Sequence, residues 1–233
     1  MRAIALVTAL LAVTAQRDNP RPYVVLSNPH IVEAETPGYE ELAYELTNNT
    51  AQAVTGWGIR YEVTFDDGTK RTGGFGMLGP FRESDPPGHR PVVAYSAERK
   101  THILGPRGRS PARDVTVTLQ WAIFSDRSFI GDATGVKDAF ESRERSYQQH
   151  SFVANALRAA REEGTGVDAL RAALRRVSEG PEEMKPWLVH VRGNIQRALD
   201  SKVPLNPDAY LAALIQRAES ERDRFDAHRR PRR

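Results

Sequence analysis

The hydrophobic pattern of this 233-residue chain changes its period once, near Asp132, and that change limits what the chain can fold into. Before this point, apolar residues recur at every second position, which is the spacing of strands with one buried face. After it they recur at every third or fourth position, which is the spacing of amphipathic helices. We therefore expect an α+β chain of two domains. Residues 23–132 would form a β-sandwich domain and residues 133–227 a helical region.

The clearest strand pattern runs from Trp57 to Phe65, where five large apolar residues alternate with small or polar ones. This alternation predicts a strand with one face in the core and one in water, as in antiparallel sheets. Asp66-Asp67-Gly68 then predicts a tight hairpin, because Asp-Gly supplies the positive φ angles of such turns. The partner strand would run from Thr69 to about Phe75.

Other short segments repeat the strand pattern between stretches rich in Gly, Pro and Asp. One of them has Val115, Val117, Leu119, Trp121 and Ile123 on a single expected face. Such spacing of six to eight short strands predicts an antiparallel sandwich or barrel. The further expected strands are 23–27, 42–46, 92–96, 102–104 and 128–130.

Four helices are expected after the β part. The first, from Val136 to about Glu163, is long and highly charged, and it either packs on the sandwich or projects towards another chain. A break in it near His150 is left open. Gly and Pro signals separate the later helices, and their short connections predict antiparallel neighbours. Asp168 is expected to cap the second helix, and Asn206-Pro207-Asp208 to begin the fourth. The third is expected to bury Trp187, Leu188, Val191, Ile195 and Leu199.

Residues 1–15, MRAIALVTALLAVTA, predict a cleaved secretory signal. Arg2 gives the positive start, an apolar run follows, and Val13 and Ala15 put small residues before the expected cleavage site. As a helix the apolar run would rise about 20 Å, whereas a bilayer core is about 30 Å thick. We therefore expect a periplasmic or secreted protein with no transmembrane span after cleavage. Residues 16–22 would be a polar linker.

Composition narrows the possible partners. The chain has no cysteine, which excludes disulfides and a lipid-anchored cysteine and favours a bacterial envelope. Its net charge of +3 gives no concentrated basic face, so nucleic acid is not an expected partner. Residues 228–233 form a basic tail with four arginines, which we interpret as a solvated end; contact with phosphates or anionic lipid is the alternative.

Residues 45–68, ELTNNTAQAVTGWGIRYEVTFDDG, resemble the immunoglobulin-like domains of bacterial exported proteins. In such domains an Asn-rich turn is followed by a small polar stretch, an alternating aromatic strand and an Asp-Gly hairpin. The resemblance covers about residues 22–131 and implies a sandwich that binds or spaces other molecules, without shared catalytic residues. The cysteine pair of antibody domains is missing, so the resemblance does not extend to that subgroup.

No catalytic residue, metal ligand or cofactor is predicted, and the binding residues remain unknown. The six histidines include no pair at the i, i+4 spacing of a helical metal site. The loop Gly105–Ser110 lacks the ending of a phosphate-binding loop. Trp57 and Trp121 both lie in the apolar register of their strands, which favours a core role over sugar stacking. The adjacent acidic pairs would diverge and be solvated; they are Glu40-Glu41, Asp66-Asp67, Glu162-Glu163 and Glu182-Glu183.

These observations favour an exported, non-enzymatic binding or scaffold module of the bacterial cell envelope. Its partner would be another envelope protein or a wall component. Contact would be made through an exposed sheet edge or the charged helix near Tyr147. The alternative is an enzyme acting on cell-wall sugar or peptide, with a site between the two halves lined by His102, His190 or paired carboxylates. A third hypothesis is an oligomerising scaffold.

Overall fold

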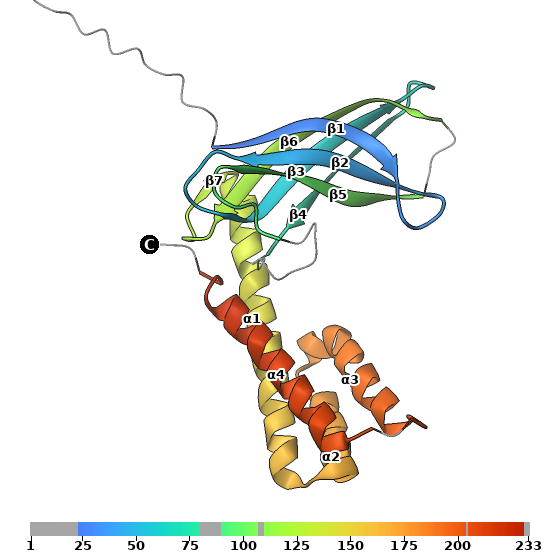
Figure 1. The fold of residues 1–233 in the computed structure, drawn as a ribbon, viewed down its shortest axis with the longest axis vertical. Helices are drawn as coiled ribbons and strands as arrows, with labels where there is room; N and C mark the ends of the chain where they lie inside the picture. Colours follow the sequence, from blue (N-terminus) through green and yellow to red (C-terminus); the bar gives the residue numbers. More distant parts are fainter. Residues whose placement is uncertain (1–22, 80–89, 107–109, 204, 231–233) are drawn as a thin grey trace, which may run out of the picture.

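The computed structural model describes residues 23–79, 90–106, 110–203 and 205–230. The expected signal and linker lie outside the described residues. Two antiparallel sheets are followed by four α-helices, so the expected α+β class is confirmed. Figure 1 shows the sheets at one end of the molecule, with α1 and α4 leading from them to α2 and α3 at the other.

The two sheets have the strand orders β1-β2-β5 and β4-β3-β6-β7. The hairpin at Asp66-Asp67-Gly68 joins β3 to β4 as predicted, with Gly68 at a φ of 80°. The strands are β1 (Val24–Glu33), β2 (Tyr39–Asn48), β3 (Val54–Phe65), β4 (Lys70–Met77), β5 (Ser96–Pro106), β6 (Ala112–Phe124) and β7 (Phe129–Gly131).

Two strand predictions need correction. The expected strand 92–96 does not form: Val92 makes only an isolated bridge to Val54, and Tyr95 has a φ of 53°, which breaks the extended conformation before β5 begins. The expected strand 23–27 is too short, because β1 continues to Glu33. A register shift after Ser27, with Asn28 at a φ of 52°, carries the strand past Pro29.

The sheets pack face to face around one apolar core. Trp57 lies at its centre, fully buried, and its indole Nε1 donates a hydrogen bond of 2.8 Å to the hydroxyl of Tyr44 on the opposite sheet. This pairing satisfies both polar atoms inside the core, as burial requires. The expected core role of Trp57 is therefore confirmed.

Trp121 is also buried, but on the other face of its sheet. Gly58 pairs with Trp121 and Ile59 with Leu119, so Gln120 is the extra residue of a β-bulge. One extra residue reverses which face the following side chains occupy. Leu119 therefore packs on the core between the sheets, whereas Trp121 and Ile123 belong to a separate cluster under α1. The predicted single apolar face from Val115 to Ile123 is wrong beyond the bulge.

The ring of Trp121 fills a space that glycines leave open. A Cβ added at Gly58 would lie 2.2 Å from the indole Nε1, and one added at Gly135 would lie 2.5 Å from it. The ring therefore sits between β3 and the first turn of α1. Gly58 was expected on the water-facing side of β3. It is buried instead, because the indole ring of Trp121 covers it.

Four α-helices and one 3-10 turn follow the sheets. The first begins earlier than Val136, because the carboxylate of Asp132 accepts hydrogen bonds from the amides of Thr134 and Gly135. It has no break at His150. Asp168 does not cap the second helix; it pairs with Arg171. The elements are α1 (Ala133–Glu163), α2 (Gly166–Ser178), η1 (Glu182–Met184), α3 (Lys185–Leu199) and α4 (Pro207–Asp226).

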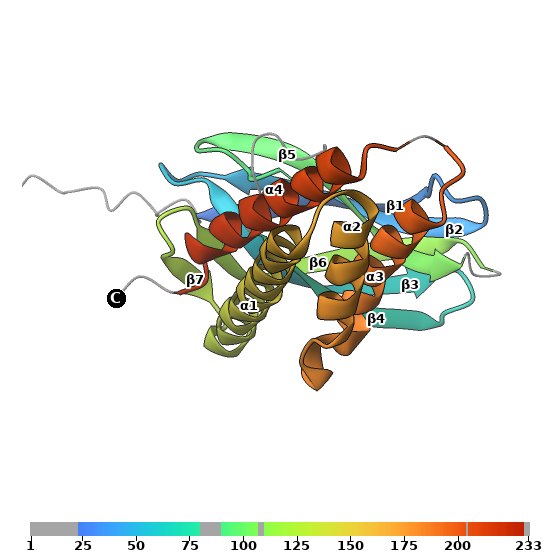
Figure 2. The same ribbon diagram turned by 90° about the horizontal axis from the view of Figure 1, so that it is seen from below.

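Helix α1 belongs to both parts of the molecule. Its first turns pack on Trp121 through Val136, Ala139 and Phe140, and its later turns form an apolar core with α2, α3 and α4. Figure 2 shows α4 lying along α1 and α3 lying beside α2. The expected packing of the first helix on the sheets is confirmed, and its projection towards another chain stays a prediction.

Candidate functional site

A buried arginine lies at the junction between the sheets and the helices. Arg143 of α1 is 0 % exposed. It donates hydrogen bonds to the carbonyls of Leu78 (2.8 Å), Thr55 (3.1 Å) and His228 (3.4 Å). Burial lowers the pKa of this guanidinium to about 10. Arg143 thus links α1 to β3, to the segment after β4 and to the residues after α4.

The residues expected to line an active site between the halves do not come together. His102 lies on β5 and stacks on Phe75 of β4, with ring centroids 3.5 Å apart. His190 is exposed on α3, in the part of the molecule away from the sheets (Figure 1). Among the described residues, no group of three or more His, Asp and Glu side chains is arranged to hold a metal ion.

A hollow of about 90 Å³, which we call the helical groove, lies between α3 and α4 with α1 as its floor. It exists because α3, whose buried residues are Leu188 and Ile195, packs mainly on α2, whereas α4 packs along α1. Trp187 and Val191, expected in the core, are therefore only partly buried. The lining is His150, Val153 and Leu157 of α1, Trp187, Val191 and Asn194 of α3, and Leu214, Arg217 and Ala218 of α4.

His150 is the polar group on the floor of the helical groove. Its ring meets Trp187 edge-on, with centroids 5.1 Å apart, and stacks on Phe225 at 5.8 Å. Burial lowers the pKa of His150; Glu221 opposes this shift and Arg217 adds to it. The imidazole is therefore neutral at pH 7, and the floor of the groove is aromatic and uncharged.

The lowered pKa of His150 gives a testable dependence of stability on pH. Its folded pKa is below the unfolded value of 6.5, so below that pH the unfolded chain binds more protons and folding weakens. We expect the free energy of unfolding to fall between pH 7 and pH 5. His150→Phe, which keeps an aromatic ring, should lose less. Urea titrations at the two pH values measure both differences, and an equal loss in the two proteins would refute this role of His150.

One cation, that of Arg217, lines the helical groove, and others lie nearby on α3. Arg217 of α4 pairs with no carboxylate in the part of the chain that the structure describes. Arg197 of α3 donates to the side chain of Asn194, which lines the groove. Helix α3 carries Lys185, Arg192 and Arg197 and has no Asp or Glu. The groove is thus an apolar channel with positive edges.

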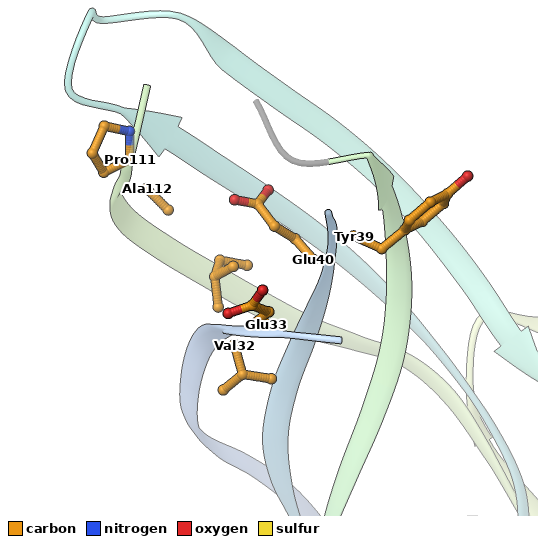
Figure 3. Close-up of a pocket in the computed structure, with 7 residues that line it drawn as sticks. Val32, Glu33, Tyr39, Glu40, Pro111 and Ala112 are labelled. Atoms are coloured by element: carbon orange, nitrogen blue, oxygen red, sulfur yellow. The ribbon is translucent and has the colours of Figure 1, made fainter. Parts of the chain in front are cut away.

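A second hollow, which we call the hairpin pocket, encloses about 200 Å³ where the β1–β2 hairpin meets the start of β6. Figure 3 shows the carboxylates of Glu33 and Glu40 on the side of the hairpin that faces β6, while the ring of Tyr39 points away from them. Glu33 and Glu40 are directly paired across the two strands. The lining is Ile31, Val32, Glu33, Tyr39, Glu40, Pro111 and Ala112.

Sequence reasoning missed the hairpin pocket. It grouped Glu40 with Glu41, whose side chain lies on the opposite face of β2, and did not connect Glu40 with Glu33. The signal that could have found the pair is the turn at Thr36-Pro37, because Glu33 and Glu40 are equally distant from its centre. Register follows from such symmetry once both flanking segments are taken as strands.

The surface near Tyr147, expected as a contact region, is covered by the chain's own C-terminal segment. The guanidinium of Arg229 lies over the Tyr147 ring at 4.0 Å and pairs with Glu144 and Asp226, each at 2.8 Å. His228 and Arg229 therefore dock on α1, which corrects the expectation that the whole tail is solvated, whereas Arg230 is exposed. Residues 231–233 lie outside the described residues, as do 107–109 of the loop Gly105–Ser110.

The helices that the structure describes include none long and apolar enough to span a membrane. No protein-family model matches the chain, and no curated protein matches it. A hypothetical protein from Peptoclostridium difficile 630 is 10 % identical with a TM-score of 0.33, over 50 % of this chain and 90 % of its own. A Northeast Structural Genomics Consortium target is 10 % identical with a TM-score of 0.23, over 46 % and 79 %. These likenesses carry no argument about function.

Proposed function

We propose that this chain is an exported, non-enzymatic binding module of the bacterial cell envelope and that the helical groove holds its partner. The apolar hollow between α3 and α4 carries the proposal. Trp187, Val191 and Leu214 line it although they could have been buried by closer packing of the two helices. A groove of this kind accepts the apolar face of an amphipathic helix.

The chemistry of the partner follows from the edges of the groove. Arg217 and Arg197 favour carboxylates beside the apolar anchors of the bound helix. The hollow of about 90 Å³ has room for the end of one large apolar side chain. Aromatic and arginine side chains at the centre of an interface contribute most of its binding energy. We therefore assign the partner as an envelope protein with an acidic amphipathic helix.

Two further observations support the export and spacing parts of the proposal. Residues 1–15 have the layout of a secretory signal, and the chain has no cysteine. The orders β1-β2-β5 and β4-β3-β6-β7 match strands A-B-E and C′-C-F-G of an immunoglobulin-like sandwich. In this proposal the sandwich is a domain that spaces the helical region from its surroundings.

The surroundings of His150, the candidate general base in the helical groove, favour a binding role over catalysis. Acid–base chemistry needs paired titratable groups whose environments separate their pKa values. The charged groups that act on His150 are Glu221, Arg217 and Arg224, and of these only the cation of Arg217 lines the helical groove. Arg143 and the cluster around Trp121 occupy the interior of the junction between the sheets and the helices. A hollow of about 320 Å³ remains beside Trp121, and the carboxylates that line it are those of Asp132, which caps α1, and Asp138.

A pair of synthetic peptides tests the proposed groove. Both are amphipathic helices with leucines at i, i+4 and i+7; one carries glutamates beside the leucines and the other carries lysines. Trp187 fluorescence reports occupancy, because this ring lines the groove. We expect the acidic peptide to bind at least tenfold more tightly, which is about 1.4 kcal/mol. Equal affinity for the two peptides would contradict the proposal.

Reversing the charge of one groove residue should remove the preference for the acidic peptide. Arg217→Glu removes the cation at the edge of the groove and should weaken acidic-peptide binding at least tenfold. Arg192→Glu is the matched control, because it makes the same change in net charge on α3 while Arg192 is not among the groove-lining residues. If both variants weaken binding equally, the effect is one of total charge and the groove is not the site.

A further inference from the structure

The hairpin pocket holds two like charges at directly opposed positions. Glu33 of β1 and Glu40 of β2 are register partners, so their Cβ atoms point to the same face of the sheet. Cross-strand like charges at such positions destabilise a sheet. Figure 3 shows both carboxylates facing the hollow in front of Pro111 and Ala112.

The carboxylate of Glu40 is unpaired among the described residues. The residue is 7 % exposed, and within the described ranges it makes no hydrogen bond or ion pair. Its carboxylate oxygens are not enclosed but open into the hollow, where they attract a cation. Its side chain points into the hairpin pocket, where a ligand of opposite charge would supply the missing partner.

The lining favours an organic cation over a metal ion. Apart from the two carboxylates it is largely apolar, with Ile31, Val32 and Ala112 around the hollow. Calcium takes six to eight oxygen ligands, and the described residues include no third acidic group at this place. A guanidinium is planar, weakly hydrated and able to bridge two carboxylates, which suits an apolar hollow of about 200 Å³.

We infer that the hairpin pocket binds a guanidinium group on an apolar stem, such as an arginine side chain, between Glu33 and Glu40. The apolar stem would lie against Ile31 and Ala112, and the planar head would bridge the two carboxylates. This site lies on the sheets and is independent of the helical groove. The inference therefore stands or falls separately from the proposed function.

The test is a titration of the ¹⁵N-labelled full chain with N-acetyl-arginine amide, followed by NMR. We expect saturable shifts confined to the β1–β2 hairpin and to residues 111–112. The neutral isostere N-acetyl-citrulline amide should produce none. Equal shifts with the citrulline compound, tighter binding of calcium chloride at the same amides, or no saturable shift with the arginine compound would each overturn the inference.

Two matched variants distinguish binding in the hairpin pocket from an effect of the protein's net charge. Glu40→Gln should weaken binding of the arginine compound at least tenfold, whereas Glu41→Gln, on the opposite face of β2, should change it less than twofold. Without ligand, Glu40→Gln should raise the thermal midpoint, because it relieves the like-charge pair. A lower midpoint would mean that Glu40 already has a stabilising partner, and equal loss of binding in both variants would place the ligand elsewhere.

Discussion

Replacing Trp121 with alanine should lower the free energy of unfolding by about 3–5 kcal/mol, the usual cost of removing a buried aromatic ring. The cost should be high because the ring occupies a space bounded by Gly58, Gly135 and Phe140. Backbone atoms form two sides of this space, and they cannot collapse into the cavity as side chains can.

The measurement is urea unfolding followed by circular dichroism. Trp121→Phe should lose much less stability than Trp121→Ala, because the smaller phenyl ring still fills part of the space that the indole occupies. Gly58→Ala provides an independent check, since its Cβ would clash with the indole and should also destabilise the chain. If Trp121→Ala lost less than about 1 kcal/mol, α1 would not be held on the sheets by this ring.

Replacing Arg143 with alanine should lower the free energy of unfolding by about 2–4 kcal/mol. Three carbonyls, those of Thr55, Leu78 and His228, would lose their donor. A buried acceptor without a partner costs about 1–3 kcal/mol. Relief from burying a cation offsets part of the loss, which is why the expected total is below the sum. Arg143→Lys should not restore the loss, because an ammonium cannot reproduce the fork of a guanidinium.

The Arg143→Ala variant should also unfold less cooperatively than the parent chain. Arg143 joins the sheets to both α1 and the end of α4, so its removal should separate the unfolding of the two parts. In the parent chain carrying Trp187→Phe, the remaining tryptophans Trp57 and Trp121 both lie in the sheets, and their fluorescence and the circular dichroism of the helices should report one transition. In Arg143→Ala they should report two. Lys137→Ala, which removes an exposed pair with Glu141 within α1, should cost less than about 1 kcal/mol and leave one transition. Equal behaviour of the two variants would contradict the role given to Arg143.

The parts of the fold that depend on neighbours in sequence could be predicted from the sequence. Asp67-Gly68 specifies its turn locally, and Asn206 caps α4 through the amide of Ala209, three residues away. The parts that depend on pairing between strands could not. The bulge at Gln120 transfers Trp121 to the outer face, and no period in the sequence reveals an extra residue that is defined only by its partner strand.

The two candidate sites could not be predicted from the sequence for the same reason. Trp187 lies in the apolar stripe of α3, and the stripe does not specify whether a neighbouring helix covers it. Trp187 is partly exposed because α3 packs mainly on α2, and this packing is determined by the tertiary structure. Glu40 and Glu33 become a pair only through the register of β1 and β2. In both cases the residues are visible in the sequence, but their neighbours are set by the fold.

The most direct test of the proposed function is site-specific photocrosslinking in intact producing cells. A photoreactive phenylalanine analogue is placed either at position 191, in the helical groove, or at position 189, on the exposed face of the same helix. We expect one discrete crosslinked envelope protein from position 191, absent from position 189 and lost in Arg217→Glu. Crosslinking from position 189 alone, or equally from both positions, would contradict a binding role for the groove.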